Sequence, residues 1–122
     1  MSNNEKFYIN GAWSDPVSAK KFDIIHPGNE EIIASISMGS EADVNIAVDA
    51  AREAFEAWQF STVADRVALL ERILAVYESR AEEFVKIMPY EMGTTISFSR
   101  EVHMPVGIGH IQAAVEALKS HR

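Results

Sequence analysis

Gly107 and Gly109 imitate the beginning of a cofactor-binding motif near the carboxyl end of the sequence. Followed by Gln112, they resemble the glycine-rich turn that holds a dinucleotide. That turn needs a strand before it, a third small residue for helix packing and an acidic residue about 20 positions later for the ribose. Here Pro105 precedes the glycines, Gln112 replaces the third glycine, and the sequence stops at Arg122. We therefore predict no cofactor-binding residue, and we expect the glycines to allow close packing at the start of a helix.

Four histidines could bind a metal ion or shuttle protons, but their spacing favours neither role. His103 and His110 are seven residues apart with Pro105 between them, and no carboxylate is spaced to complete a ligand set. The sequence has no cysteine, which removes thiolate ligands, disulfides and thiol nucleophiles together. Solvation or local hydrogen bonding is the expected role of the histidines, which are His26, His103, His110 and His121.

Two acidic pairs, Glu30 with Glu31 and Glu82 with Glu83, are the remaining candidates for acid–base chemistry. The members of each pair are adjacent in sequence, so their side chains point in different directions. Both pairs border amphipathic elements whose outer face should be charged, which predicts a solvated surface. No serine lies in a G-x-S-x-G turn. We therefore predict no catalytic residue in this chain.

Length and composition indicate one soluble globular module. The 122 residues fit a single domain, and 48% hydrophobic with 24% charged residues is typical of a folded chain. Eleven Lys and Arg against 18 Asp and Glu give a net charge of −7, which argues against nucleic acid and anionic membranes as partners. No apolar run approaches the ~18 residues that cross a bilayer, and residues 1–6 are polar where a signal peptide is apolar. We expect a cytoplasmic location.

Residues 1–38 are predicted to form a small antiparallel strand meander. Asn10 and Gly11 tolerate positive φ and lie between short apolar stretches, which is typical of a tight hairpin. Residues 22–26 and 31–38 are rich in residue types that favour β-strands, and a Pro-Gly turn separates them. They are therefore predicted to form two further strands.

Residues 40–122 are predicted to form three to four helices. Ser40 with Asp43 is a capping signal for the first helix, and Thr62 with Asp65 repeats it for a longer second helix. This chain alone is therefore expected to be an α+β fragment, with small N-terminal antiparallel strands followed by helices.

Proline and glycine divide the helical part further. Pro89 should kink or restart the second helix because it lacks an amide hydrogen, and Gly93 is placed to terminate it. A last helix is predicted to begin near Pro105. Aromatic residues at helical spacing beside leucines are expected to lie in the core; they are Phe55, Trp58 and Tyr77.

The order of these signals resembles the N-terminal part of the NAD(P)-dependent aldehyde dehydrogenase superfamily. The matching stretches are residues 7–13 (FYINGAW), 22–27, 30–34, 39–44 (GSEADV), 47–55 (AVDAAREAF) with Trp58, then Arg66, Leu69, Leu70, Ile73 and residues 91–93 (EMG). Each match alone is weak, but together they cover nearly the whole chain in one order.

The resemblance implies an α/β family fold and an oxidoreductase that converts an aldehyde to a carboxylic acid with NAD⁺ or NADP⁺. In the family a cysteine thiolate attacks the aldehyde, a hydride passes to the nicotinamide, and a glutamate activates water to hydrolyse the thioester. These two residues and the glycine-rich cofactor loop lie downstream of the matching region. Residues 1–122 would then be the N-terminal part of the cofactor-binding domain, without catalytic competence or cofactor binding of their own, and with the downstream domains absent.

The resemblance also implies partners. The fragment would pack against the remaining domains of the same enzyme, which would bind a small aldehyde, and full-length relatives commonly form dimers or tetramers. Left alone, the fragment would expose apolar surface and could associate with itself. The aldehyde and the choice between NAD and NADP are left open.

Many family members bind a structural monovalent cation through backbone carbonyls just before the x-Pro turn. The corresponding residues here are Ile24 and Ile25, which makes their carbonyls the candidate metal ligands. His103 falls where the family has an acidic ligand, and imidazole is a poor ligand for a hard cation. Plain strand carbonyls are the alternative interpretation.

A second class of function stays open from the residues alone. The apolar helix faces would also suit a free-standing helical interaction module. The two hypotheses differ in whether the reading frame continues into a glycine-rich βαβ unit and a cysteine-containing catalytic domain.

Overall fold

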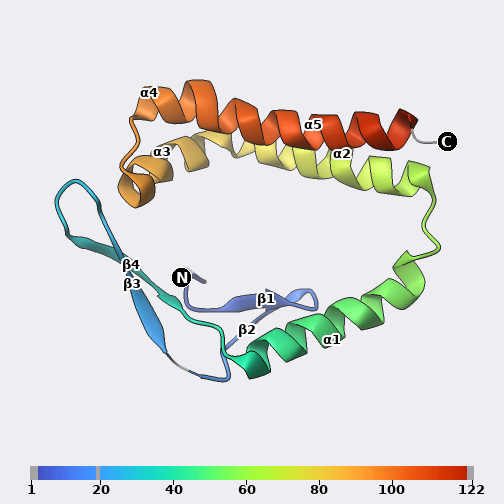
Figure 1. Cartoon of the computed structure of the whole chain (residues 1–122), viewed down its shortest axis with the longest axis horizontal. Coiled ribbons are helices and arrows are strands. Elements are labelled where there is room, and N and C mark those ends of the chain that lie inside the picture. Colours follow the sequence, from blue (N-terminus) through green and yellow to red (C-terminus); the bar gives the residue numbers. More distant parts are fainter. Residues whose placement is uncertain (1–2, 19, 121–122) are drawn as a thin grey trace. The chain divides into compact units, whose positions relative to one another are not determined.

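The computed structural model describes residues 3–18 and 20–120, which form two units divided between Phe60 and Ser61. The first unit holds the strands and one long helix, and the second is helical (Figure 1). Each unit is described by itself below.

The first unit begins with the predicted hairpin. Strands β1 (Phe7–Ile9) and β2 (Ala12–Ser14) pair antiparallel, with Ile9 opposite Ala12. The two residues between them adopt positive φ, 51° at Asn10 and 77° at Gly11. Because asparagine and glycine reach this region at low cost, the two-residue turn was predictable from their identities alone.

A second hairpin follows, and it forms a sheet of its own. Strands β3 (Lys21–Ile25) and β4 (Ile32–Ser37) pair antiparallel, with an irregularity in the register between Ile24 and Ile25. In the described part of the chain β2 does not pair with β3, so there are two separate two-stranded sheets. The prediction of one continuous meander over residues 1–38 is therefore wrong.

Helix α1 (Glu41–Trp58) follows the strands in the first unit. Ser40 caps it: its hydroxyl accepts from the Asp43 amide, and Asp43 Oδ2 accepts from the Ser40 amide at 2.8 Å. The predicted capping box is thus confirmed. The same carboxylate also reaches the Val17 amide, with Oδ1 at 2.8 Å. This bond fixes the connection after β2 at the start of α1.

The second unit begins with the other predicted capping box. Helix α2 (Val63–Ser79) is capped by Thr62, whose hydroxyl accepts from the Asp65 amide while Asp65 Oδ2 accepts from the Thr62 amide at 2.9 Å. The helix ends at Arg80, where φ of −105° and ψ of 9° leave the helical region.

Helix α3 (Ala81–Met92) starts directly after this break and contains Pro89. The restart predicted at Pro89 is wrong, because the chain breaks nine residues earlier and remains helical through the proline. The alternative of a kink at Pro89 stays a prediction. The Arg80 amide donates to both Val76 and Tyr77 carbonyls, which ends α2, and Pro89 lies in the last turn of α3. Gly93 ends α3 with a φ of 72°, as predicted.

A compact bend follows and leads into the last helix. It consists of one turn of α-helix, α4 (Ile96–Phe98), and a π-helical segment, η1 (Ser99–His103), which runs straight into helix α5 (Met104–Ser120). The start of α5 beside Pro105 is confirmed, whereas the π-helical segment had no sequence signal. Ser99 within it is fully buried, and its hydroxyl donates to the Thr95 carbonyl at 3.0 Å.

The core of the second unit lies between helices. Its buried apolar side chains are Val85, Met104 and Val115. Helices α2 and α5 run antiparallel, side by side (Figure 1). A Cβ atom at Gly107 would meet the Tyr77 hydroxyl and lie 3.0 Å from Tyr77 Cζ, so glycine is what lets the two helices approach. The expected packing role is confirmed for Gly107 but not for Gly109, where a Cβ atom would have no neighbour within 4 Å.

These elements confirm the expected α+β class, with short antiparallel strands followed by helices. One expectation about the core fails: Phe55 is 58% exposed and Trp58 is 44% exposed. Both lie on α1 in the first unit, and their exposure is far above that of a core residue. Tyr77, in contrast, is half-buried and packs against Phe84 with ring centroids 5.2 Å apart.

Candidate functional site

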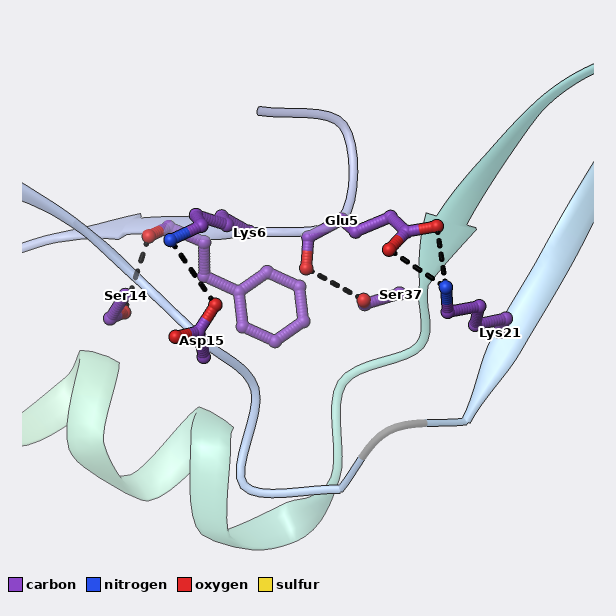
Figure 2. A network of polar contacts seen from close by, with 7 residues as sticks. Glu5, Lys6, Ser14, Asp15, Lys21 and Ser37 are labelled. Carbon is purple, nitrogen blue, oxygen red and sulfur yellow. Dashed lines mark hydrogen bonds and ion pairs between the residues drawn. The ribbon is translucent and has the colours of Figure 1, made fainter. Parts of the chain in front are cut away.

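A cluster of charged and polar side chains ties the N-terminal segment to the strands (Figure 2). Lys21 Nζ lies 2.8 Å from both carboxylate oxygens of Glu5, and Lys6 Nζ lies 3.2 Å from Asp15 Oδ1. The Ser37 hydroxyl donates to the Glu5 backbone carbonyl at 2.7 Å. These five residues are called the N-terminal polar cluster below.

The N-terminal polar cluster borders a hollow of about 600 Å³, whose lining includes Ile33, Ala34 and Ser35. Its two lysines are each paired with a carboxylate, so the cluster carries no excess of either charge. The pairs are well solvated, with the Asp15 side chain 81% exposed. Such exposed pairs contribute little to stability, and the cluster positions the segment before β1 without offering a nucleophile or an unpaired acid.

Asp43 is the most constrained carboxylate of the first unit. It is 5% exposed and accepts bonds from the Ser40 hydroxyl at 2.6 Å, the Val17 amide and the Ser40 amide. These bonds lower the pKa of Asp43 below its ordinary value, and the bond from the Ser40 hydroxyl has the largest effect. The carboxylate is therefore a fixed anion that holds backbone amides, a structural role and not that of a proton donor.

The predicted histidine candidates make local contacts in the described chain. His26 Nδ1 accepts the Gly28 amide at 2.9 Å, which is a local turn contact. The His103 ring packs edge-on against Phe98 with centroids 5.0 Å apart. His110 is exposed on α5, and His121 lies outside the described residues. Over residues 3–18 and 20–120, no three His, Asp or Glu side chains are grouped to hold a metal ion.

The acidic pair on α3 is engaged in surface ion pairs, as expected for a charged outer face. Arg100 Nη2 lies 3.0 Å from Glu82 Oε2, and Arg80 Nη2 lies 2.8 Å from Glu83 Oε2. These arginines lower the pKa of both carboxyls, mainly through the side-chain hydrogen bonds. At the other pair, Glu31 accepts a bond from the Asn29 side chain at 2.7 Å within the β3–β4 turn. These contacts of Glu31, Glu82 and Glu83 are those of solvated surface side chains.

The candidate cation ligands lie at the irregular end of the second sheet. The register of β3 against β4 shifts between Ile24 and Ile25, the two residues whose carbonyls the resemblance singles out. Cation binding there stays a prediction.

None of the helices in the described part of the chain has both the length and the apolar character needed to cross a bilayer.

Sequence reasoning missed the polar contacts that join distant segments. The Glu5–Lys21 pair spans 16 residues and the Asp43–Val17 bond spans 26. Neither spacing follows a helical or strand period, so no local pattern could have indicated them.

Comparison with known proteins gives one consistent answer. The sequence profile of the aldehyde dehydrogenase family matches residues 13–122. A curated Staphylococcus epidermidis protein named as an aldehyde dehydrogenase is 39% identical over 120 residues, covering 98% of this chain and 25% of that protein.

Solved structures agree. An aldehyde dehydrogenase from Bartonella henselae superposes with a TM-score of 0.95 at 36% identity, over 100% of this chain and 26% of that one. A mutant of aldehyde dehydrogenase C from Pseudomonas syringae was solved with NAD⁺ and octanal. It superposes with a TM-score of 0.95 at 36% identity, over 98% of this chain and 25% of that one.

The extent of these matches defines what the chain represents. It spans about a quarter of the length of the relatives it matches. The chain belongs to the aldehyde dehydrogenase family and corresponds to the N-terminal portion of such an enzyme.

Proposed function

We propose that this chain is the structural N-terminal part of an aldehyde dehydrogenase that oxidises an aldehyde to a carboxylic acid with NAD⁺ or NADP⁺. The observation that carries the proposal is the family match over residues 13–122 in a sequence without cysteine. In the reaction that the resemblance implies, a cysteine thiolate attacks the aldehyde and a glutamate activates the water that releases the acid. Both groups and the cofactor site would come from the part of the enzyme outside the matched quarter.

The proposed contribution of this chain is support of the cofactor-binding domain. Asp43 and the N-terminal polar cluster fix the strand segments to one another and to the start of α1. The helical unit is held by Val85, Met104 and Val115 and by the close α2–α5 approach at Gly107. NAD is favoured as the cofactor because two of the similar structures, from Pseudomonas syringae and of the protein PnpE, were solved with it.

The finer parts of the proposal concern partners and location. The remaining domains of the same enzyme are the proposed partner, and self-association of the isolated chain follows if its apolar faces stay uncovered. A cytoplasmic location, an assignment of residues 1–122 to the cofactor-binding domain and cation binding at Ile24 and Ile25 stay predictions. The family match favours the enzyme over a free-standing interaction module.

A graft tests the proposed function. This chain replaces the matching N-terminal quarter of the Bartonella henselae enzyme, whose structure it follows with a TM-score of 0.95. We expect the graft to reduce NAD⁺ in the presence of short aldehydes. We expect no activity from the host enzyme that lacks its N-terminal quarter, and none from this chain alone.

The controls separate folding from catalysis. Circular dichroism of the graft and of the truncated host shows whether each is folded. A folded graft without activity above the truncated host would contradict the proposal, and so would turnover by the 122-residue chain alone.

A further inference from the structure

The turn of the first hairpin contains the only Asn-Gly pair of the sequence, Asn10 with Gly11. The other four asparagines precede asparagine, glutamate or isoleucine. An asparagine loses its side-chain amide without an enzyme when the backbone nitrogen of the next residue attacks Cγ. Glycine hinders this attack least because it has no Cβ atom. By sequence, Asn10 is therefore the asparagine of this chain that is most prone to deamidation.

The reaction needs water and no other reagent. The Gly11 nitrogen bonds to Asn10 Cγ, the bond from Cγ to Nδ2 breaks, and the side-chain amide leaves as ammonia with the proton of the Gly11 nitrogen. Water then opens the resulting five-membered imide at one of its two carbonyls. Opening at Cγ leaves an aspartate. Opening at the main-chain carbonyl leaves an isoaspartate, in which the backbone runs through Cβ and Cγ and is one atom longer.

The hairpin holds Asn10 in a conformation that prevents this attack. Ile9 pairs with Ala12, and the two residues between them have φ of 51° and 77°. A two-residue turn with positive φ at both positions is of type I′, in which ψ of the first residue is about 30°. At that ψ the Gly11 nitrogen lies nearly opposite Cβ across the Cα–C bond of Asn10, whereas ring closure needs both on the same side. The turn must therefore open before the imide forms.

The turn is open to solvent. Asn10 and Gly11 are both exposed, and a Cβ atom added to Gly11 would have no neighbour within 4 Å. The two residues also line a hollow of about 360 Å³ together with alanines of α1. Water reaches the turn from outside, so conformation and not burial limits the reaction.

The hairpin that supplies this protection is small. Strands β1 and β2 have three residues each, and in the described chain they form a sheet of their own. A two-stranded hairpin of this kind is marginally stable. One of its cross-strand contacts is the Tyr8–Trp13 pair, whose rings meet edge-on with centroids 5.3 Å apart. We therefore expect transient openings, in which the Gly11 nitrogen can reach Asn10 Cγ.

We propose that Asn10 is a deamidation site that reacts only when the β1–β2 hairpin opens. The isoaspartate product makes the opening permanent, because the longer backbone no longer joins Ile9 and Ala12 through a two-residue turn in register. The new carboxylate also adds a negative charge to a chain whose net charge is −7. Asn10 thus converts a transient loss of the hairpin into a lasting covalent change. The proposal does not rest on the proposed function.

The test compares deamidation of folded and unfolded protein. The Bartonella henselae graft is incubated at mildly alkaline pH with and without urea, and the peptide that contains Asn10 is analysed by chromatography and mass spectrometry. A hairpin recloses in about 1–10 μs, far faster than the chemistry, so the deamidation rate follows the open fraction. We expect the folded graft to react at least about tenfold more slowly than the graft in urea.

Circular dichroism establishes that the sample without urea is folded. The isolated 122-residue chain, checked in the same way, is the second setting for the same comparison. The readout is the modified peptide and not enzyme activity, so an inactive graft leaves this test intact.

Trp13→Ala tests whether hairpin opening controls the rate. It removes the ring contact with Tyr8, which should raise the open fraction and the deamidation rate of the folded graft about fivefold, without changing the rate in urea. Phe60→Ala is the matched control, because Phe60 is an 80% exposed aromatic residue of the same unit outside the hairpin. It should leave the rate unchanged. Trp13→Leu, with a smaller acceleration, replaces Trp13→Ala if that variant does not fold.

Three outcomes overturn the proposal. Equal rates in folded and unfolded protein would show that the turn does not protect Asn10. An acceleration by Phe60→Ala as large as that by Trp13→Ala would show that general unfolding exposes the site. The isoaspartyl graft should also exchange the amide hydrogens of Ile9 and Ala12 faster than an Asn10→Asp graft, which carries the charge without the extra backbone atom. Equal exchange in these two proteins would contradict a lasting loss of the hairpin.

Discussion

Gly107→Leu is expected to destabilise the helical unit by about 2–3 kcal/mol. A Cβ atom at this position would meet the Tyr77 hydroxyl, and it would lie 3.0 Å from Cζ and 3.3 Å from Cε1 of the same ring. Tyr77 also packs against Phe84, so its ring cannot turn away without losing that contact. The side chain would therefore separate α2 from α5. The free energy of unfolding, measured by urea denaturation, gives the size of the effect.

Gly109→Leu is the matched control for this prediction. Gly109 lies in the same helix, and a Cβ atom added there would have nothing within 4 Å. Because leucine favours a helix over glycine, this variant should gain about 0.5–1 kcal/mol. Adding Tyr77→Ala to Gly107→Leu should recover part of the loss, since the two sites share one contact. Equal effects at Gly107 and Gly109 would contradict the close-approach explanation.

Asp43→Ala is expected to lower the unfolding midpoint of the first unit by roughly 5 °C or more. It removes the acceptor of the Val17 amide and of the Ser40 amide and hydroxyl together. These part-buried bonds are made to one charged acceptor, so their joint loss is costly. Hydrogen exchange of the Val17 amide should accelerate in step with the loss. Protection of that amide equal to the wild type would show that Asp43 does not hold the connection after β2.

The same carboxylate makes stability depend on pH in a defined direction. The pKa of Asp43 is lowered in the folded chain, chiefly by the Ser40 hydroxyl, so its stabilising effect is complete above the unfolded value of about 4. It is lost as the pH falls through the lower folded value. Asp43→Asn should flatten this acid limb in urea denaturation measured across the acid range. Asp65→Asn is the comparison variant, because Asp65 caps α2 in the same way as Asp43 caps α1. Among the contacts of the described residues, Asp65 accepts no bond from a distant backbone amide such as that of Val17.

The elements that could be predicted from sequence are those set by short-range chemistry. The Asn10–Gly11 turn and the Ser40 and Thr62 caps depend on residues no more than three positions apart. Their conformations follow from steric freedom at glycine and asparagine and from hydroxyl and carboxylate acceptors at helix ends. Local patterns were therefore enough to locate the start of the hairpin and of the first two long helices.

Other features depend on contacts that no local pattern contains. The connection between the two sheets is held at α1 by the bond from the Val17 amide to Asp43, which spans 26 residues. The α2–α3 break at Arg80 carries no glycine or proline, whereas Pro89, the obvious breaker, is accommodated in the last turn of α3. Phe55 and Trp58 look like core residues by spacing, yet they are exposed because burial depends on a partner that spacing alone does not place.

The candidate site shows the same division. Single residue types were enough to expect surface roles for Glu82 and Glu83, and the arginines beside them support that expectation. The family could be predicted because many weak sequence matches occur in one order along the chain. No single motif of this chain is specific enough to indicate the family alone. The N-terminal polar cluster was missed because its members are brought together by the fold.

The central claim is that cofactor binding belongs to the rest of the enzyme and not to this chain. Calorimetric titration of NAD⁺ and of NADP⁺ into the isolated 122-residue chain and into the graft tests it most directly. We predict no saturable heat for the isolated chain and saturable binding of at least one cofactor by the graft. Saturable binding to the isolated chain would contradict the account and would make the Gly107 region a working phosphate-binding turn.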